Sequence, residues 1–533
     1  MRGITWRGPA AESALIGLFA FVIGVIGAGR PSLWLDEVAT MSATGRSLPQ
    51  LWALLHHVDG VHGAYYFLMQ GWFTVFPADQ FWARFVSSVL VGAAASGVVV
   101  IGRQLASRQV AVAAGVVFAV LPRVTWAAVE ARSYAMSMFD AVWITVLFLM
   151  ALRRRSVWLW VAYAAGLALS TVFNVFVIFV VAAHAVLVLG NRPARRTIAG
   201  WICAVVAATI AALPFMYAIK AQQAQVGWIW AIGPGTLGQL IGDQYFPAVY
   251  SSSERATNLV PNHKVTSAEI AAGVHAQALV APFIIAVLVL TVVAWRMRRR
   301  PGAPLGERPR LLGWMAAAWI IVPTAVIVAY SMVREPMYQP HYLSFTAPAL
   351  ALLLGMAAVT VGREPRRIAV VLAVLAAAAV PNYVAQRGPY AKYGMDYIQV
   401  ADIISAHAQP GDCLNIDLSA NSTVVGPLKA AKPAAYARLR DFGQDKSALE
   451  LEALFETRLP ITAWADKLPS CPVVWTVTER DRSLPAHRQA GTLTPGPRLA
   501  STAAYQVPAA RGFRVIEQWQ LNVAQVAKLV PAK

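Results

Sequence analysis

Uninterrupted apolar segments recur along most of this chain, and they constrain its fold more than any other feature. About 20 apolar residues are enough to cross the hydrocarbon core of a bilayer as a helix. Of the 533 residues, 58% are hydrophobic and 13% are charged, whereas soluble domains carry about 25% charged residues. The sequence therefore predicts an α-helical, multi-pass membrane protein with about eleven spans. These segments are Ala14–Gly29, Phe85–Ile101, Val110–Thr125, Tyr134–Leu152, Trp158–Val172, Val175–Leu189, Ile198–Ile219, Ala278–Trp295, Leu311–Met332, Leu343–Val361 and Ile368–Val384.

The basic residues lie mainly in short arginine clusters between the apolar segments. A net charge of +19 is compatible with nucleic-acid binding, but this placement marks cytoplasmic loops instead, so we exclude nucleic acid as a partner. A cytoplasmic N-terminus puts Arg153–Arg155, Arg192–Arg196 and Arg296–Arg300 inside. The same topology puts the loop after Gly29 and everything after about Ala385 outside. We therefore predict a plasma-membrane protein whose clusters of acids and histidines face the outside.

The first predicted outer loop contains two apolar stretches that are too short to span the membrane. Ser47–His57 has Leu48, Leu51, Trp52 and Leu55 on one helical face, which is typical of an amphipathic helix lying in the membrane interface. A second such element is expected over Gly63–Phe76. The alternative for that second stretch is a buried hairpin packed on the bundle.

The chain changes character after Val384, where long apolar segments end. We predict a membrane domain over residues 1–385 and a small extracytoplasmic α/β domain over residues 386–533. Cys413 and Cys471 would each stand at the start of a strand, and an oxidising compartment would let them form a disulfide if those strands are neighbours. The expected elements of the domain are an amphipathic helix, Asp396–Ala408, and the strands Cys413–Leu418, Pro472–Val477 and Phe513–Val523.

The predicted outer turns together carry acids, cations and tyrosines that suit one kind of chemistry. A carboxylate can deprotonate an acceptor hydroxyl, and guanidinium groups can neutralise a phosphate leaving group. This combination suggests glycosyl transfer from a lipid phosphate. The alternatives are an ordinary solvated loop around Asp36 and Glu37, and a structural ion pair between Glu130 and Arg132. The candidate residues are Asp36, Glu37, His62, Arg84, Glu130, Arg132, Arg334, Glu335, Tyr338, His341 and Tyr342.

Several short motifs, in their order along the chain, resemble those of the GT-C glycosyltransferases. The nearest branch is that of protein-O-mannosyltransferases and aminoarabinose transferases, and within it the envelope glycosyltransferases of mycobacteria and related actinobacteria. The resemblance covers roughly residues 10–385 and implies the GT-C fold. The motifs are Leu33-Trp34-Leu35-Asp36-Glu37, His62-Gly63-Ala64-Tyr65-Tyr66, Arg84 ahead of the second span, Glu130-Ala131-Arg132-Ser133-Tyr134-Ala135, and Pro340-His341-Tyr342-Leu343 with Pro348.

The resemblance implies a polyprenyl-phosphate-linked sugar donor, inverting transfer at the outer membrane face, and Asp36 as the general base. Glu37 would support Asp36, the donor phosphate or a divalent cation held by both acids. Relatives often have an Arg-Tyr pair where this chain has His341-Tyr342, so Arg132 or Arg334 is expected to carry more of the phosphate binding here. The residues expected to bind donor phosphate or substrate are His62, Arg84, Glu130, Arg132, Tyr134, Arg334, Tyr338, His341 and Tyr342.

The expected donor sugar is mannose, with arabinofuranose second. The expected acceptor is an envelope glycan or glycolipid, or a secreted protein. Two other classes of function stay open at this stage. A transporter or flippase of lipid-linked sugars would use the same lipid contacts, but it would need ionisable groups along a path through the membrane. A non-catalytic relative would scaffold envelope synthesis through its outer domain, against which the intact Asp36 and Glu37 argue.

Overall fold

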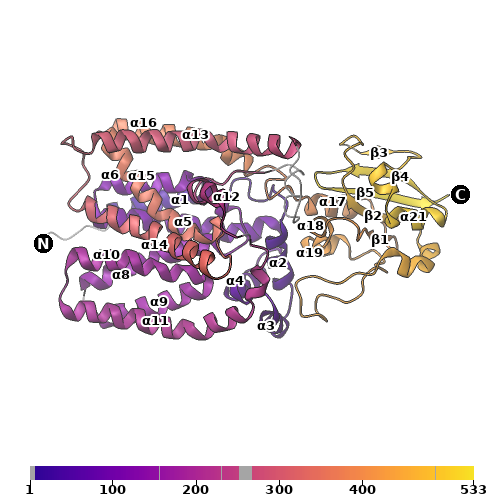
Figure 1. Cartoon of the computed structure of the whole chain (residues 1–533), viewed down its shortest axis with the longest axis horizontal. Helices are drawn as coiled ribbons and strands as arrows, with labels where there is room; N and C mark the ends of the chain where they lie inside the picture. The colour runs from indigo at the N-terminus through magenta and orange to yellow at the C-terminus, as the bar shows by residue number, and fades with distance from the viewer. Residues whose placement is uncertain (1–6, 155, 230, 251–266, 487, 533) are drawn as a thin grey trace.

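A helical bundle and a small sheet domain make up the protein (Figure 1). The computed structural model describes residues 7–154, 156–229, 231–250, 267–486 and 488–532. Three short helices lie at the end of the bundle that faces the sheet domain: α2 (Leu35–Thr44), α3 (Leu48–His57) and α4 (Gly63–Phe73). The polar loop between the first two apolar segments therefore sits between the two parts of the molecule.

Long apolar helices build the bundle, so the predicted multi-pass helical fold is confirmed. Among the described residues, seven helices are long and apolar enough to cross a membrane, or eight if one bent pair counts as a span. Three shorter apolar helices occupy the first, fifth and sixth predicted segments, so the count of eleven stays a prediction. The helices are α1 (Arg7–Val25), α5 (Gln80–Leu105), α6 (Arg108–Val120), α7 (Pro122–Ala128), α8 (Tyr134–Arg154), α9 (Val157–Phe173), η2 (Val175–Val180), α10 (Val181–Asn191), α11 (Arg195–Ala221), α13 (Ser267–Met297), α14 (Pro309–Val333), η6 (Pro340–Thr346), α15 (Ala347–Gly362) and α16 (Pro365–Ala385).

The third predicted segment is not one straight helix. Pro122 has no backbone N–H to donate and favours an extended residue before it, and Leu121 is extended, with ψ 126°. Helices α6 and α7 consequently meet at 59°. Because α7 ends at Ala128 and α8 begins at Tyr134, this bend sets where the intervening turn lies.

The amphipathic helix predicted in the first loop forms as α3. Ser47 caps it, accepting from the backbone N–H of Gln50 in a capping box. Leu51 and Leu54 are fully buried, whereas Trp52 is 60% exposed. The second predicted element forms as α4, with one face buried through Tyr65, Tyr66 and Met69. Its packing therefore resembles the buried alternative, and the placement of both helices at a membrane surface stays a prediction.

The C-terminal sheet has the strand order β1-β2-β5-β4-β3, with β1 and β2 parallel and the other pairs antiparallel. A disulfide joins Cys413, the first residue of β1, to Cys471 just before β2. The third predicted strand is shorter than expected, because the chain turns after Gln520 and returns as β5. The strands are β1 (Cys413–Ile416), β2 (Val474–Glu479), β3 (Gln489–Ala490), β4 (Phe513–Gln520) and β5 (Ala524–Pro531), and the main helix is α17 (Tyr397–His407). The remaining short elements are η1 (Gly60–His62), η3 (Gln223–Val226), α12 (Pro234–Gly238), η4 (Gln239–Asp243), α18 (Ser422–Val425), α19 (Leu428–Ala431), η7 (Pro433–Ala435), η8 (Ile461–Ser470), α20 (Pro497–Ala500) and α21 (Ala503–Ala510).

The sheet domain and the first loop share one hydrophobic core. Leu33, Val38 and Tyr65 of the loop belong to the same buried cluster as Ile398 and Trp475 of the sheet domain. Burial of apolar surface is the main source of stability. The first loop and the sheet domain therefore stabilise each other.

Candidate active site

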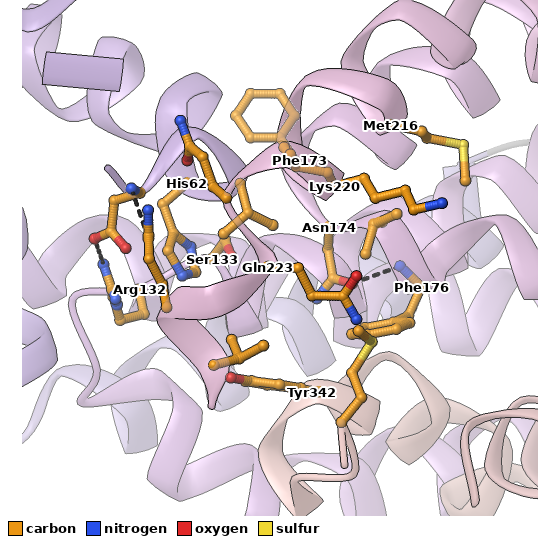
Figure 2. Close-up of a pocket in the computed structure, with 18 of the residues that line it drawn as sticks. His62, Arg132, Ser133, Phe173, Asn174, Phe176, Met216, Lys220, Gln223 and Tyr342 are labelled. Atoms are coloured by element: carbon orange, nitrogen blue, oxygen red, sulfur yellow. Dashed lines mark hydrogen bonds and ion pairs between the residues drawn. The ribbon is translucent and has the colours of Figure 1, made fainter. Parts of the chain in front are cut away.

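A cavity of about 500 Å³ opens at the end of the bundle beside the first loop. Arg132 and His62 lie on one side of it, and Phe176, Met216 and Lys220 lie on the other (Figure 2). The side opposite Arg132 therefore combines apolar side chains with one lysine. Its lining is Asp36, Asp59, Val61, His62, Arg132, Ser133, Tyr134, Phe173, Asn174, Val175, Phe176, Met216, Ile219, Lys220, Gln222, Gln223, Gln225, Val226, Trp228, Tyr330, Met337 and Tyr342.

Asp36 lies in the first turn of α2 and lines the cavity with a side chain that is 29% exposed. One of its oxygens is 3.8 Å from Nη2 of Arg132. Burial raises the pKa of the Asp36 carboxyl above its usual range; Arg132 opposes this effect, and the nearby Asp59 and Glu37 carboxylates add to it. A carboxylate with a raised pKa and access to a cavity is a suitable proton acceptor.

Arg132 is held between two acids and a tyrosine. Its Nη1 donates to the Tyr66 hydroxyl at 2.6 Å and lies 3.7 Å from a carboxylate oxygen of Asp59. The Tyr66 hydroxyl in turn donates to Asp59. The Arg132 side chain is only 5% exposed, so its orientation is fixed by these contacts. The result is a positioned guanidinium beside the cavity.

Two buried nitrogens at this cavity lack a hydrogen-bond partner among the described residues: Nε of Arg132 and Nδ1 of His62. Buried polar atoms normally have partners. Burial, with Arg132 nearby, lowers the pKa of His62 to about 3, so its imidazole is neutral at neutral pH. These two nitrogens can bind a polar ligand at no expense to the protein's own hydrogen bonds.

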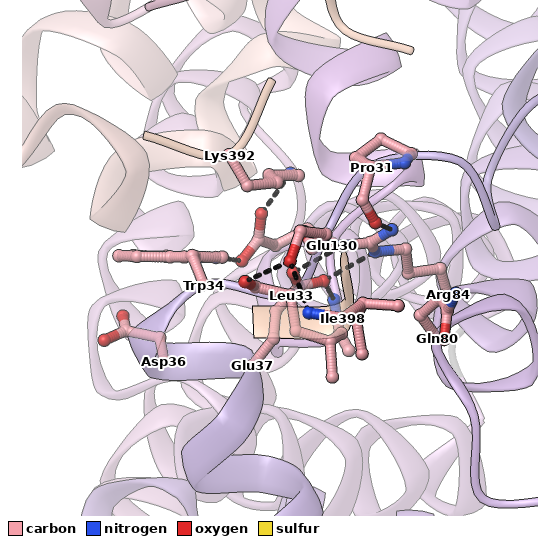
Figure 3. A network of polar contacts seen from close by, with 12 residues as sticks. Pro31, Leu33, Trp34, Asp36, Glu37, Gln80, Arg84, Glu130, Lys392 and Ile398 are labelled. Carbon is pink, nitrogen blue, oxygen red and sulfur yellow. Dashed lines mark hydrogen bonds and ion pairs between the residues drawn. The ribbon is translucent and has the colours of Figure 1, made fainter. Parts of the chain in front are cut away.

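Glu37 directly follows Asp36 but points away from it, toward Arg84 (Figure 3), and it does not line the cavity. It is fully buried and pairs with Arg84, whose Nε and Nη2 donate to its two oxygens at 2.7 and 2.6 Å. The five N–H groups of an arginine all have acceptors here, because the remaining ones donate to the carbonyls of Ala28, Pro31 and Ser32. Glu37 also accepts from the backbone N–H of Ala131 at 2.8 Å. This ion pair therefore fastens the first loop to α5 and to the turn before α8.

Glu130 is also fully buried and lies in the same network (Figure 3). Its two oxygens accept from the indole N–H of Trp34 and from the ammonium of Lys392. Its backbone carbonyl accepts from the Ser87 hydroxyl at 2.6 Å. Glu130 thus connects the residue that precedes α2 with the chain segment that follows the last membrane helix.

The remaining predicted site residues are distributed unevenly. Tyr134 and Tyr342 line the cavity. His341 is buried, and its ring contacts that of Tyr134 with centroids 4.9 Å apart. Tyr338 is buried and donates to Gln244 at 3.2 Å. Arg334 is exposed and does not line the cavity, so it is not brought together with the others.

The acidic pair does not offer a joint metal site. No group of three or more His, Cys, Asp or Glu side chains that could hold a metal ion occurs within the described ranges. Both oxygens of Glu37 already accept from Arg84, and Asp36 points elsewhere. The expected cation ligands, Asp36 and Glu37, therefore do not fit a shared ion, because metal-binding carboxylates need free oxygens converging on one point.

The sequence did not single out several residues that the structure brings to the site. Tyr66 ends the His62–Tyr66 motif and Asp59 lies three positions before that motif, but nothing in their spacing indicates that both contact Arg132. Gln222 and Gln225 follow α11 and clamp the first loop. Gln222 accepts from the N–H of Gly60 at 2.8 Å and donates to Leu55, and Gln225 accepts from the N–H of Asp59 at 3.0 Å and donates to His57. The only signal in the sequence was glutamine beside tryptophan at a predicted membrane edge.

The long apolar helices and the small sheet domain form a multi-pass membrane protein, and the likeness in fold to the solved structures below confirms the predicted GT-C fold. No protein-family model matches the chain, and no curated protein matches it in sequence. Among solved structures, the chain is similar to ArnT from Cupriavidus metallidurans in the apo state, with a TM-score of 0.54, 13% identity, and 96% of this chain and 97% of that chain covered. It is also similar to ArnT from the same organism bound to undecaprenyl phosphate, with a TM-score of 0.51, 14% identity and the same coverage, 96% and 97%. These likenesses concern the fold.

Proposed function

We propose that this protein is a glycosyltransferase that moves a sugar from a polyprenyl-phosphate donor to a hydroxyl of an acceptor. One observation carries the proposal: Asp36 and Arg132 meet at one side of a cavity whose other side includes apolar side chains of the membrane helices. A proton acceptor, a phosphate-binding cation and a lipid-compatible wall are the three features that such a reaction requires.

Asp36 is the proposed general base. In its ionised form it takes the proton from the acceptor hydroxyl as that oxygen attacks the anomeric carbon of the donor sugar. The bond between that carbon and the phosphate oxygen breaks, and polyprenyl phosphate leaves with the bonding electrons. A single displacement of this kind inverts the anomeric configuration. The access of Asp36 to the cavity supports this role.

Arg132 and His62 are the proposed partners of the donor phosphate. The unpartnered Nε of Arg132 offers a donor to the phosphate oxygens, and Nδ1 of His62 is a further polar contact. Lys220 at the far side of the cavity adds a second positive charge. Because charge builds up on the phosphate as the glycosidic bond breaks, fixed cations there favour the transition state over the ground state.

The polyprenyl chain is proposed to lie along Phe173, Val175, Phe176 and Met216, which line the cavity from membrane helices. ArnT, whose fold is similar, has been solved with undecaprenyl phosphate bound. We further propose that the cavity and the C-terminal domain face outward from the plasma membrane, because the arginine clusters mark the opposite loops as cytoplasmic.

Mannose remains the proposed sugar, with an envelope glycan, glycolipid or protein as acceptor. These finer assignments rest on the motifs that resemble those of envelope glycosyltransferases. The saturated contacts of Glu37 and Arg84 favour a different role from the one their motifs suggested. We assign both residues to holding the first loop in place, and phosphate binding to Arg132.

The test is transfer of radiolabelled mannose from polyprenyl-phosphomannose in membranes that contain matched amounts of wild type or Asp36→Asn. Loss of a general base is expected to lower transfer by about 10²- to 10⁴-fold. Asp402→Asn, the same change at a carboxylate that is 57% exposed in the C-terminal domain, is the control and should keep wild-type transfer. Equal transfer by Asp36→Asn and wild type would exclude Asp36 as the base. If the wild type gives no label, polyprenyl-phosphoarabinose is the next donor to test.

A further inference from the structure

The chain segment between α16 and α17, residues 386–396, is threaded into the membrane bundle rather than exposed as a hinge. We call it the linking segment. Arg387 is 4% exposed. Its guanidinium donates to the carbonyls of Ile23 and Ile26, both at 3.2 Å, and to that of Thr125 at 3.3 Å. Ile23 lies in the last turn of α1, Ile26 directly follows that helix, and Thr125 lies in α7, so the start of the linking segment is fixed among the helices.

The linking segment then runs against the stretch that leads into α2. The backbone N–H of Ser32 donates to the carbonyl of Pro389 at 2.8 Å, and the Ser32 hydroxyl oxygen accepts from the N–H of Ile398 at 3.2 Å. The rings of Trp34 and Tyr393 lie with centroids 4.5 Å apart. Ser32 and Trp34, four and two positions before the proposed base, therefore contact residues more than 350 positions further along the chain, in the linking segment and at the start of α17.

Lys392 is the central contact of the linking segment. Its side chain is 1% exposed, its ammonium pairs with the fully buried Glu130, and it lies 4.5 Å from the centre of the Trp126 ring. The other oxygen of Glu130 accepts from the indole N–H of Trp34. A chain of direct contacts thus connects Lys392, through Glu130 and Trp34, to the N-terminus of α2.

The far end of the linking segment is tied to the sheet. One carboxylate oxygen of Asp396 accepts from the backbone N–H groups of Asn522, Val523 and Ala524 at 3.0, 2.8 and 3.0 Å. Asn522 and Val523 lie in the turn between β4 and β5, and Ala524 is the first residue of β5. Any displacement of the sheet domain would therefore pull on the linking segment.

A second contact binds the sheet domain to the first loop. Arg46, which is 7% exposed, donates to the carbonyls of Ala448 and Ala453. The Ser42 hydroxyl donates to the carbonyl of Leu454. Because Ser42 lies in α2, the same helix is held at its start by the linking segment and near its end by the sheet domain.

We propose that Lys392 is a positioning residue of the active site, and that through it the C-terminal domain is required for the placement of Asp36. This inference rests on the proposed function, because it takes Asp36 as the base. It assigns the C-terminal domain a role inside the transferase.

Charge balance explains why Lys392 is needed at this position. The two ion pairs Glu37–Arg84 and Glu130–Lys392 are all but completely buried, and together they are neutral. Removal of one partner from a buried pair leaves an uncompensated charge, whereas removal of both partners can be nearly neutral. Without the ammonium, Glu130 must take up a proton or move towards water, and either change alters the contact that holds Trp34.

The experiment compares kcat and the donor KM of the full-length wild type, Lys392→Met, and Lys392→Met combined with Glu130→Gln. Lys392→Met is expected to lower kcat by about 100-fold with the donor KM changed by no more than about threefold, because a small displacement of a catalytic group affects the reaction step most. In the double variant, the glutamine carbonyl still accepts from Trp34 with no charge left to neutralise. We expect its kcat to recover to within about tenfold of the wild type. Lys432→Met, which breaks an exposed ion pair with Asp402, is the matched control and should leave kcat unchanged.

Three results would overturn the inference while leaving the proposed function intact. The first is a wild-type kcat for Lys392→Met. The second is an equal loss in the single and double variants, because Lys392 would then not act through Glu130. The third is a raised donor KM with unchanged kcat, which would make Lys392 a substrate contact. If Lys392→Met does not fold, the kcat of the double variant is the test. A double variant that folds but is inactive overturns the inference. Absence of transfer by the wild type overturns the proposed function and this inference together.

Discussion

At the scale of single residues, Asp36 and Glu37 show how two adjacent acids come to have different roles. Successive residues of an α-helix point about 100° apart, so one carboxylate of the first turn of α2 meets the cavity and the next meets Arg84. The side chain of Asp36 is 29% exposed, and that of Glu37 is fully buried. Asp36 is the proposed base because it is partly exposed to solvent, whereas Glu37 is buried and both of its oxygens accept from Arg84.

Glu37→Gln is therefore expected to destabilise the protein much more than Asp36→Asn does. The glutamine leaves the Arg84 guanidinium buried without its counter-charge, which costs about 3–5 kcal/mol. Asp36→Asn removes only a partly exposed partner of Arg132. Thermal denaturation of both variants in the same detergent measures the difference. A melting temperature for Glu37→Gln equal to that of wild type would contradict the structural role of the ion pair.

At the scale of elements, the sequence predicted the helices well because each long apolar segment has only one stable form in a bilayer. The α3 cap and the start of α17 were also predictable, since Ser47 and the helical spacing of the apolar residues are local signals. The bend at Pro122 was missed because the apolar run continues through it. Strand β5 was missed because Leu521 and Val523 make the turn before it look like the continuation of one longer strand.

Only the site residues that lie within a recognisable motif could be predicted from the sequence. Asp36, His62 and Arg132 lie in recognisable motifs and do line the cavity. Lys392 resembles any single lysine after a membrane span, and its partner Glu130 is 262 positions away. Contacts over such distances leave no periodic pattern in one sequence. Likewise, no residue near Arg84 in the sequence indicates that all of its N–H groups donate to acceptors within the protein.

The glutamine clamp after α11 is an element whose function can be tested by itself. Gln222→Ala combined with Gln225→Ala removes four hydrogen bonds to the backbone of residues 55–60, each worth about 1 kcal/mol. Asp59 has a left-handed backbone conformation, with φ 56°, so its loop depends on such support. We expect the donor KM to rise roughly tenfold. The control is Gln506→Ala, which removes a side-chain hydrogen bond within the C-terminal domain and should leave the donor KM unchanged. If the double variant also keeps the wild-type donor KM, the glutamines do not support donor binding.

At the scale of the whole molecule, the bundle, the first loop and the sheet domain depend on one another. The loop contributes Leu33 and Tyr65 to a core that also contains Trp475 and Val526 of the sheet. Arg46 and Lys392 add polar contacts on either side of that core. A change that destabilises the sheet domain should therefore also disturb the first loop, which lines the cavity.

The disulfide provides a test of that dependence. Cys413 and Cys471 enclose a loop of 58 positions, for which the entropy lost by the unfolded chain corresponds to about 4 kcal/mol. Cys413→Ser should lower the melting temperature under oxidising conditions and should also lower transfer at temperatures at which wild type is still active. Cys203→Ser, at the exposed free cysteine of α11, is the matched control. If the sheet domain of Cys413→Ser unfolds while sugar transfer persists, the active site does not depend on the folded sheet domain.

The contact between Glu130 and Lys392 also sets an order of events during biosynthesis. Synthesis proceeds at about 5–20 residues per second, so the 262 positions between the two residues correspond to roughly 15–50 s. Throughout that interval Glu130 is present without its counter-charge, and the turn that carries it cannot take its final place. We therefore expect the nascent protein to remain inactive until the linking segment after α16 has taken its place, which means that a chain terminated before Lys392 would carry every cavity residue and still transfer little sugar.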